Sequence, residues 1–415
     1  MSRSNASNYF PCGRVVVVMR SVLLLALTGF AVSSALQAVP PLTVDLNTPA
    51  RQRWVPAVKK VVAAHGWENS LGGLLEFYKP QLQSINLLRP QTYPMLENVL
   101  QNRFPEQYQE LLGIGDAIAE LGYGYEYNVS AAGLLVALPF FYELAHVTNW
   151  VPTALTSQRG GPVFELRAGS FFNKACTGIL SLPPDGTSSI IHGRNLDESP
   201  KQSRNMTLNI TVTKGGVYQY HVFDYTWIST GFYTSSRVGG VTLEENWRNV
   251  ENPTFEQFTA RVQNPNFVPV PFLFRHIQDQ LMGFDDAVSY LMSATLASPG
   301  YIIMSGPGRR GAILTLSFNN TKNVREGLDD SSNVTFKVQT NYDRWLPDPS
   351  DDPRRTVAER VLGDVEGPAR RGTELGVWMA LSTFPVHNPG TMFTVLMRAD
   401  RAPEGYVRRQ MLPKQ

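Results

Sequence analysis

Cys176 and two charged residues that follow it carry the clearest chemical potential in this sequence. Cys176 opens the run CTGI, and Arg194 and Asp197 lie in the run HGRNLD at 192–197. A cysteine side chain is either a small buried hydrophobic group or, as a thiolate, a nucleophile. A guanidinium and a carboxylate beside it would favour the second role, attack on a carbonyl carbon.

Two candidate strands would bring these groups together. Residues 176–182 and 189–194 are rich in apolar side chains, and the turn sequence Pro-Pro-Asp-Gly lies between them. An antiparallel hairpin would return Arg194 and Asp197 to the start of the first strand, next to Cys176. The thiol, the guanidinium and the carboxylate would then share one strand end.

Three more candidate residues lie in polar runs further along the chain. Glu245 lies in the run TLEEN, Asn341 in QTNYDRW and Arg354 in DDPRRT. Each also has a plain structural interpretation: a solvated strand-end charge for Glu245, a turn or capping residue for Asn341, and a surface arginine for Arg354. Arg194 and Asp197 could likewise form a core salt bridge and nothing more.

These separated motifs, in this order, resemble the family of acid ceramidase and N-acylethanolamine-hydrolysing acid amidase. These proteins are N-terminal-nucleophile cysteine hydrolases related to the choloylglycine hydrolases. The resemblance begins at the run VDLN at 44–47 and at Arg53-Trp54 and continues to the C-terminus. It is sharpest at Cys176-Thr177, at HGRNLD, and at the runs 339–345 and 351–356. It implies an α+β fold, a four-layer αββα sandwich with a helical N-terminal subunit.

The resemblance also implies that the chain cuts itself between Ala175 and Cys176, which would leave a heterodimer made from one precursor. Cys176 would then be the first residue of the second subunit, with its thiol as nucleophile and its own α-amine as general base. This mechanism needs no histidine, no metal and no cofactor. His192, which precedes a glycine, is accordingly interpreted as a packed or hydrogen-bonded histidine.

The same resemblance implies roles for the other candidates. Asp197 would hold the α-amine by accepting its hydrogen bonds, and Arg194 would bias its protonation and orient the substrate carbonyl. Asn341 would donate an N–H to the tetrahedral oxyanion. Glu245 aligns with a glutamate of the family's site, and Arg354 aligns with an arginine that braces the centre.

The sequence departs from the family pattern at several points. Gly178 stands where close relatives carry serine, and the alignment of Glu245 could shift by one position to Glu244. The Tyr-Glu pair at 142–143 lies far upstream of the cysteine, whereas the family has such a pair close before it. The intervening segment 149–175 is therefore interpreted as an insertion, and its polar, glycine-containing middle favours an exposed loop.

The first 38 residues are organised as a secretion signal. Arg3, Arg14 and Arg20 precede an apolar run that ends at Val32, and small residues follow, as a signal peptidase site requires. The alternative is an uncleaved membrane anchor, but the run is shorter than a bilayer span needs. The expected destination is the lysosome or the outside of the cell. Five N-x-S/T glycosylation sites support secretory entry: Asn128, Asn205, Asn209, Asn319 and Asn333.

Residues 39–175 are expected to form the helical N-terminal subunit and residues 176–415 the catalytic subunit. Before about residue 150 apolar residues recur every three or four positions, with Pro80 among the expected helix breaks. The run 133–142 is apolar all round, which indicates either a buried core helix or one that binds an acyl chain or lipid. After residue 176 the pattern alternates between period-two strands and short helices, as in α+β proteins.

Composition limits the alternatives. The 415 residues are 43% hydrophobic and carry a formal net charge of +2, which excludes the strong positive field of a dedicated nucleic-acid-binding protein. Two cysteines and six histidines exclude a zinc scaffold and a disulfide-rich fold. The expected function is release of a fatty acid from N-acylethanolamine or ceramide through a cysteine acyl-thioester, with peripheral contact to lipid membranes. The alternatives are an acylase for conjugated bile acids or penicillins, and a lipid-binding relative without activity.

Overall fold

A computed structural model describes residues 36–123, 134–147, 176–248, 250, 252–364 and 372–408. Residues 1–35 of the expected secretion signal, the segment 149–175, Asn128 and Ala175 therefore lie outside the described residues. The chain divides into two units, and the larger one, Ala38–Val407, contains all the described helices. In the part of the chain that is described, no helix has both the length and the apolar character that crossing a membrane requires.

Helices dominate the chain before Cys176, as the apolar spacing predicts. The helices are α2 (Ala50–Arg53), α3 (Val55–His65), α4 (Leu71–Leu88), α5 (Thr92–Arg103) and α6 (Pro105–Glu120). The break expected at Pro80 is wrong, because Pro80 lies inside α4. A proline inside a helix costs about 3 kcal/mol, and burial of Leu75, Tyr78 and Leu82 on the same helix offsets that cost.

The run that is apolar all round does not form one helix. Its described part consists of two short 3₁₀ segments, η3 (Leu134–Val136) and η4 (Leu138–Phe140), followed by α7 (Phe141–His146). Pro139 lies within η4 and cannot donate a backbone hydrogen bond. The side chains of η3 and η4 are buried, as a core segment or a segment that binds an acyl chain requires.

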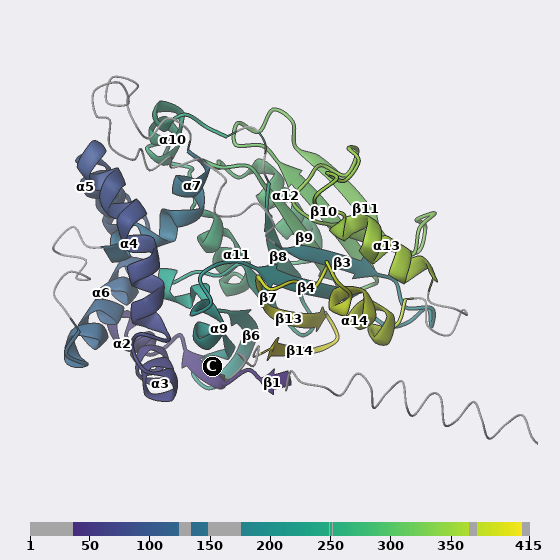
Figure 1. The fold of residues 1–415 in the computed structure, drawn as a ribbon, viewed down its shortest axis with the longest axis horizontal. Helices are drawn as coiled ribbons and strands as arrows, with labels where there is room; N and C mark the ends of the chain where they lie inside the picture. The colour runs from purple at the N-terminus through teal and green to yellow at the C-terminus, as the bar shows by residue number, and fades with distance from the viewer. Residues whose placement is uncertain are drawn as a thin grey trace, which may run out of the picture. The chain divides into compact units, whose positions relative to one another are not determined.

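The larger of the two sheets has eight strands. Its order is β11-β10-β9-β8-β7-β6-β5-β2, and Figure 1 labels the strands from β11 to β6. All neighbours are antiparallel except β2, which pairs in parallel with β5 at the sheet edge. The strands are β2 (Pro41–Asp45), β5 (Leu208–Lys214), β6 (Val217–Asp224), β7 (Thr234–Ser236), β8 (Thr242–Trp247), β9 (Gly300–Gly306), β10 (Arg310–Leu316) and β11 (Val324–Leu328). The segment before the cysteine thus contributes a strand as well as helices.

A second sheet carries the hairpin predicted around Cys176. Within the larger unit its order is β14-β13-β4-β3-β12, and these neighbours are antiparallel. The strands are β3 (Thr177–Ser181), β4 (Ile191–Asp197), β12 (Phe336–Gln339), β13 (Thr391–Arg398) and β14 (Arg401–Arg408), and β1 spans Leu36–Ala38. Thr177 pairs with Asn195 across the hairpin, so the predicted return of the second strand to Cys176 is confirmed.

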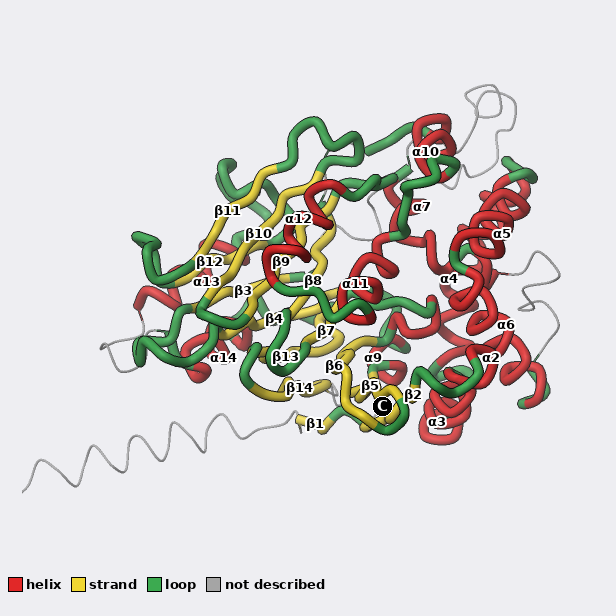
Figure 2. Tube along the Cα trace, turned by 180° about the vertical axis from the view of Figure 1, so that it is seen from behind, coloured by secondary structure: helices red, strands yellow, loops and turns green. Residues whose placement is uncertain are grey.

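The two sheets contact each other where β3 meets β8 and β9. Leu180, Tyr301 and Ile303 are among the buried side chains of the cluster between them. Helices α13 (Arg354–Asp364) and α14 (Glu374–Ser382) contact strands of the second sheet, and α11 (Val270–Asp279) and α12 (Phe284–Ser293) contact strands of the first (Figure 2). The predicted α+β class is confirmed, with two sheets in one mixed structure.

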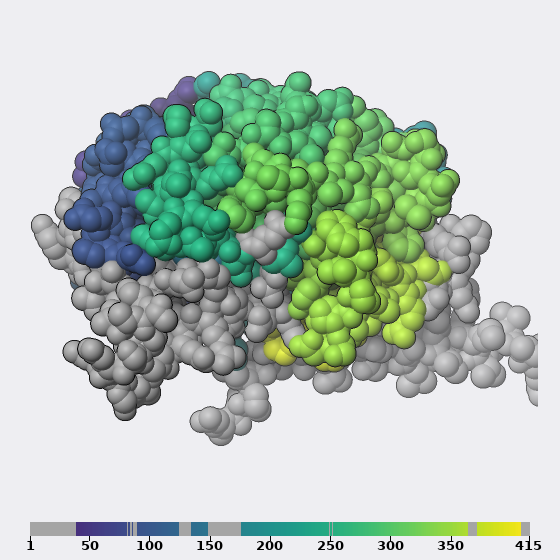
Figure 3. Space-filling model, turned by 90° about the horizontal axis from the view of Figure 1, so that it is seen from above, coloured from purple at the N-terminus to yellow at the C-terminus, as the bar shows by residue number. Residues whose placement is uncertain are grey.

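The N-terminal helices also contact the segment around α10 (Phe255–Val262), which lies between β8 and β9 in the sequence. Arg103 at the end of α5 donates through Nη1 to the backbone oxygens of Val262 (3.1 Å) and Asn264 (2.9 Å), at the end of α10. The blue N-terminal helices and the green segment that includes α10 lie side by side in Figure 3. Short elements α9 (Ser203–Met206) and η5 (Thr226–Ser229) complete the described helices.

Candidate active site

Cys176 lies immediately before β3 at the end of the hairpin. Its side chain is buried, with 3% of the residue exposed, and its backbone φ is +75°. A positive φ is uncommon for a residue with a Cβ atom and marks a strained position. Burial raises the pKa of the Cys176 thiol, and the charge of Arg194 opposes that shift.

Arg194 lies across the hairpin from the thiol. Its Nη2 atom is 3.6 Å from the Cys176 Sγ atom, and its Nη1 atom donates to the backbone oxygen of Tyr233. The side chain is fully buried. The salt bridge with Asp197 that the sequence left open is not formed, because Asp197 pairs with Arg354 instead. Arg194 thus brings a buried positive charge directly to the sulfur.

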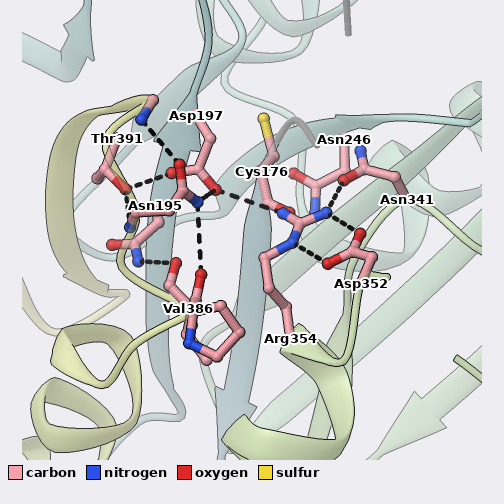
Figure 4. A network of polar contacts seen from close by, with 12 residues as sticks. Cys176, Asn195, Asp197, Asn246, Asn341, Asp352, Arg354, Val386 and Thr391 are labelled. Carbon is pink, nitrogen blue, oxygen red and sulfur yellow. Dashed lines mark hydrogen bonds and ion pairs between the residues drawn. The ribbon is translucent and has the colours of Figure 1, made fainter. Parts of the chain in front are cut away.

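Arg354, at the start of α13, connects most of the remaining candidates (Figure 4). Its guanidinium donates to the carboxylate of Asp352 (both distances 2.7 Å), to the Cys176 backbone oxygen (2.7 Å) and to the Oδ1 atom of Asn341 (2.7 Å). Its Nη1 atom is 3.3 Å from the Asp197 Oδ2 atom. The surface interpretation of Arg354 is wrong, since only 1% of the residue is exposed.

Asp197 ends β4 and is buried among donors. Its Oδ1 atom accepts from the Thr391 hydroxyl (2.5 Å) and its Oδ2 atom accepts from Arg354 and from the Asn388 amide (3.0 Å). Burial raises the pKa of the Asp197 carboxyl, and the positive charge of Arg354 opposes the shift. These contacts fix the carboxylate at the same strand end as Cys176.

Asn341 is held from both ends of its side-chain amide. Its Nδ2 atom donates to the Trp247 backbone oxygen (2.8 Å), and its Oδ1 atom accepts from Arg354. A side-chain amide nitrogen carries two hydrogens, so one donor remains after the bond to Trp247. Figure 4 shows Asn341 and Cys176 on the same side of Arg354, with the sulfur pointing away from the guanidinium.

A cavity with a volume of about 70 Å³ lies beside the thiol. Six of its lining residues are apolar: Leu74, Leu138, Phe141, Leu196, Ile228 and Trp247. Its polar lining consists of Cys176, Asp197, Glu198, Glu245, four tyrosines (Tyr78, Tyr142, Tyr225, Tyr233), Thr226 and Ser229. The apolar run before the insertion therefore also lines the cavity, through Leu138 and Phe141.

Glu245 on β8 lines this cavity. The interpretation of Glu245 as a solvated strand-end charge is therefore wrong. Only 4% of the residue is exposed, and burial raises the pKa of its carboxyl to about 8. A hydrogen bond with Tyr142 and the charge of Arg194 partly oppose that shift. Tyr142 thus lies at the site together with Cys176, although the two are far apart in the sequence.

Glu244, the other possible aligned glutamate, lies on the opposite side of β8 and meets His192. The His192 Nε2 atom is 2.9 Å from the Glu244 Oε2 atom, and its Nδ1 atom is 2.8 Å from the Thr242 hydroxyl. His192 is fully buried in these contacts, as expected of a packed histidine. A Cβ atom added to Gly178 would lie 2.5 Å from the Glu244 Oε1 atom, so this glutamate fills the space that a side chain at 178 would need.

Glu198, Tyr78 and Tyr225 are polar residues of the cavity that the sequence analysis missed. Glu198 follows Asp197 directly, at the end of the HGRNLD run, but nothing in its own sequence pattern distinguishes it. Tyr78 lies on α4 and Tyr225 follows β6, so only the folded chain brings the three together. The spacing of Tyr78 on an apolar helix face indicates core packing and gives no sign of a site.

The five glycosylation sites stay predictions. Asn333 is exposed, whereas Asn205, Asn209 and Asn319 are partly buried. Asn209 lies inside β5 between two neighbouring strands, and Asn319 accepts a hydrogen bond from the hydroxyl of Thr321 in its own tripeptide (2.6 Å).

A hairpin that carries a buried thiol, flanked by two buried arginines and an aspartate, is the arrangement expected of the family named from the motifs. The chain is similar over nearly its whole length to N-acylethanolamine-hydrolyzing acid amidases and acid ceramidases, and that resemblance is confirmed. No family model matches the chain.

Two curated proteins and one solved structure illustrate the similarity. The N-acylethanolamine-hydrolyzing acid amidase of Mus musculus is 27% identical over 394 residues, which cover 94% of each chain. The acid ceramidase of Bos taurus is 22% identical over 384 residues, covering 86% of this chain and 83% of that protein. A structure of the Caenorhabditis elegans N-acylethanolamine-hydrolyzing acid amidase ortholog is 26% identical, covers 55% of this chain and 94% of its own, and gives a TM-score of 0.48.

Proposed function

We propose that this chain is a self-cleaving cysteine amidase that releases a fatty acid from a fatty-acyl amide, with N-acylethanolamine and ceramide as the candidate substrates. One observation carries the proposal: the Cys176 thiol lines a cavity together with six apolar side chains and four tyrosines, and Arg194, Asp197, Asn341 and Glu245 lie around the thiol. The similarity to curated amidases along 94% of the chain supports the same conclusion.

The first proposed step is cleavage of the chain before Cys176. The thiol adds to the carbonyl carbon of Ala175, the peptide C–N bond breaks, and the Cys176 nitrogen takes up a proton to become a free α-amine. Water then hydrolyses the resulting thioester, which restores the thiol and leaves a new carboxylate on Ala175. The positive φ of Cys176 supports this step, because strain at the bond is relieved when it breaks.

In turnover the α-amine acts as the general base. It accepts the thiol proton as Sγ attacks the amide carbon of the substrate, and it donates a proton to the departing amine. The acyl group remains on the sulfur as a thioester until water releases it as a fatty acid. Since a free α-amine has a pKa near 7.7–8.0, the nearby charge of Arg194 and the burial of the site would lower that value toward neutrality or below.

The surrounding residues have separate proposed tasks. Asp197 holds the α-amine, and Asn341 offers its remaining N–H to the oxyanion of the tetrahedral intermediate, an effect typically worth roughly 3–4 kcal/mol. Arg194 orients the carbonyl of the substrate beside the sulfur. Arg354 positions Asp197, Asn341 and the Cys176 backbone without touching the substrate.

The wider predictions remain part of the same proposal. The contacts of α13 and α14 with strands of one sheet, and of α11 and α12 with strands of the other, support a four-layer αββα arrangement of the N-terminal-nucleophile type. Cleavage would give a heterodimer of residues 39–175 and 176–415. The word "acid" in the names of the relatives supports a lysosomal destination, and the apolar cavity supports peripheral contact with lipid membranes.

The decisive experiment combines cleavage with turnover. Purified chain at acid pH should give two bands on a denaturing gel, the larger beginning at Cys176, and should hydrolyse ceramide or an N-acylethanolamine from a panel that includes conjugated bile acids. A Cys176→Ser variant should lose at least about a hundredfold in kcat or remain uncut, because the hydroxyl is a much weaker nucleophile. Active chain in which Ala175 is still joined to Cys176 contradicts the proposal, and intact chain that binds acyl amides without hydrolysing them favours a lipid-binding protein.

A further inference from the structure

Glu198 is a half-buried glutamate on the cavity wall that the proposed mechanism does not use. It is the residue after Asp197, and it lines the same cavity as Cys176. Two tyrosine hydroxyls contact it: Tyr78 donates to Oε1 (3.1 Å) and Tyr225 donates to Oε2. Burial raises the pKa of the Glu198 carboxyl to about 8. We name Glu198, Tyr78 and Tyr225 the polar triad.

The polar triad is assembled from distant parts of the chain. Tyr78 comes from α4, before the proposed cleavage point, and Glu198 and Tyr225 come from after it. Tyr78 and Tyr225 are nearly fully buried, whereas Glu198 stays partly accessible, and it is a lining residue of the cavity. Asp197 pairs with Arg354, whereas within the described residues no ion pair to Glu198 is formed, and the charge of Arg194 only partly opposes the rise in the pKa of its carboxyl.

The chemistry of the triad limits what can lie against it. A methylene chain placed over Glu198 would remove the carboxyl from water without offering a hydrogen bond, which is unfavourable for a buried polar group. Each carboxyl oxygen already accepts one tyrosine hydrogen bond and has capacity for a second. The group that binds there should therefore carry its own hydrogen-bond donor and acceptor, as a hydroxyl does.

A fatty-acyl amide carries such a group on one side only. Its acyl chain is hydrocarbon, and the apolar lining residues Leu74, Leu138 and Ile228 match it. Its amine part carries the hydroxyl in amides of amino alcohols. Asp197, the residue proposed to hold the α-amine that protonates the leaving amine, lines the same cavity as Glu198, and this favours the amine side of the reacting bond as the place of the triad.

We propose that Glu198, held by Tyr78 and Tyr225, binds a hydroxyl group on the amine part of the substrate and so selects amides of amino alcohols. This inference rests on the proposed function and names the substrate class of the same site. Glu198 is a specificity-determining residue, and the tyrosines position it.

The test compares matched substrates with the cleaved wild-type protein and its variants. The substrates are N-palmitoylethanolamine, N-ethylpalmitamide, which lacks the hydroxyl, and N-ethyl-2-hydroxypalmitamide, which carries the hydroxyl on the acyl side. The wild type should prefer the ethanolamide over the ethylamide by at least about tenfold in kcat/KM, because a site built to bond a hydroxyl rejects the analogue that lacks it. Glu198→Leu should bring that ratio near one mainly by lowering kcat/KM for the ethanolamide.

Two further variants guard against a folding defect in Glu198→Leu. Tyr78→Phe removes one hydroxyl from Glu198 and should lower the ratio several-fold, while Glu198→Gln keeps hydrogen bonding and should retain part of it. Tyr93→Phe is the matched control, because Tyr93 is a buried tyrosine whose hydroxyl donates to the Leu82 backbone oxygen (2.9 Å) and does not line the cavity. Its ratio should equal that of the wild type.

Each other result overturns the inference. A wild-type ratio near one, a ratio that Glu198→Leu and Tyr78→Phe leave unchanged, or a Glu198-dependent preference for the 2-hydroxyacyl amide all exclude amine-side recognition. If the protein hydrolyses no acyl amide, the proposed function fails separately. Binding followed by the fluorescence of Trp247, a lining residue, then decides the inference: equal affinity for ethanolamide and ethylamide overturns it, and a Glu198-dependent preference for the ethanolamide supports it.

Discussion

At the residue scale, the candidate site depends on Arg354. A single buried guanidinium contacts the Cys176 backbone, Asp197, Asn341 and Asp352. The planar fork of an arginine can serve several acceptors in fixed directions, which a lysine ammonium cannot. The nucleophile, the residue proposed to hold its amine and the proposed oxyanion donor therefore share one positioning group.

Replacing Arg354 by another cationic residue should lower kcat, because the geometry of its hydrogen bonds matters as well as its charge. Arg354→Lys keeps the positive charge but loses the fork, and we expect kcat to fall on the order of a hundredfold because small displacements of reacting groups are costly. Arg355→Lys is the control, since Arg355 is also buried but bonds the backbone oxygens of Asp343 and Leu346 away from the thiol. Equal kcat values for the two variants, measured on cleaved protein, would contradict a positioning role.

The sequence predicts the local part of this site better than the distant part. Cys176, Arg194 and Asp197 follow from one hairpin, whose two strands and turn lie in one short continuous stretch of sequence. Asn341 and Arg354 could be named only by resemblance to a family, because nothing local distinguishes a buried arginine in DDPRRT from a surface one. Their contacts come from the pairing of β12 with β3, which fixes the start of α13 beside the thiol.

At the scale of elements, a buried ion network joins helices from either side of the cysteine. Glu110 on α6 receives hydrogen bonds from Arg53 and Trp54 at its own end of the chain (Trp54 at 2.9 Å) and from Arg275 on α11 (Nη2 at 2.9 Å). Glu110 is fully buried. A buried carboxylate that pairs with two arginines is costly to remove, because the cations lose their counter-charge.

Glu110→Gln should therefore loosen the two halves of the molecule. We expect the free energy of unfolding to fall by about 3–5 kcal/mol, and in cleaved protein the two chains should separate at lower urea concentration. Glu120→Gln on the same helix changes an exposed pair with Lys59 and should leave both measurements nearly unchanged. Urea titration followed by gel filtration measures both variants. Identical urea midpoints for Glu110→Gln and Glu120→Gln would show that the ion network of Glu110 does not stabilise the contact between α6 and α11.

Helices and strands can be predicted from the sequence where their buried side chains are apolar and recur with a regular spacing, and the prediction fails elsewhere. The helix α10 and the hairpin of β5 and β6 have regular apolar spacing in the sequence. The polar strand β8 escapes that rule, since its side chains are buried by hydrogen bonds and ion pairs, among them that of Glu244 with His192. Helix α13 carries charges along most of its length and was not predicted for the same reason.

At the scale of the whole molecule, three glutamates with raised pKa values make stability depend on pH. Burial raises the pKa values of Glu143, Glu198 and Glu245 to about 8. Between about pH 6.5 and 8 the folded protein keeps these protons and the unfolded chain does not, so stability falls as pH rises. His146, whose pKa burial lowers to about 3, acts in the opposite direction but only below about pH 6.5.

The melting temperature should accordingly decrease from about pH 6.5 to 8. Glu143→Gln, which imitates the protonated side chain at a fully buried position, should remove about 1.5 kcal/mol of that loss, since one pKa unit corresponds to about 1.36 kcal/mol. Thermal unfolding of both proteins across this range, in one buffer ionic strength, measures the difference in slope. Parallel curves for wild type and variant would mean that Glu143 is ionised in the folded protein.

The parallel pairing of β2 with β5 sets an order of events during synthesis. Strand β2 emerges from the ribosome early, but its neighbour appears only after the thiol and both strands of its hairpin have been made. The edge of the larger sheet therefore stays incomplete until the nucleophile already belongs to the nascent polypeptide. If self-cleavage requires this pairing, it follows assembly of the sheet. Residues 39–175 and 176–415, when expressed as separate chains, should then fail to associate into the native structure.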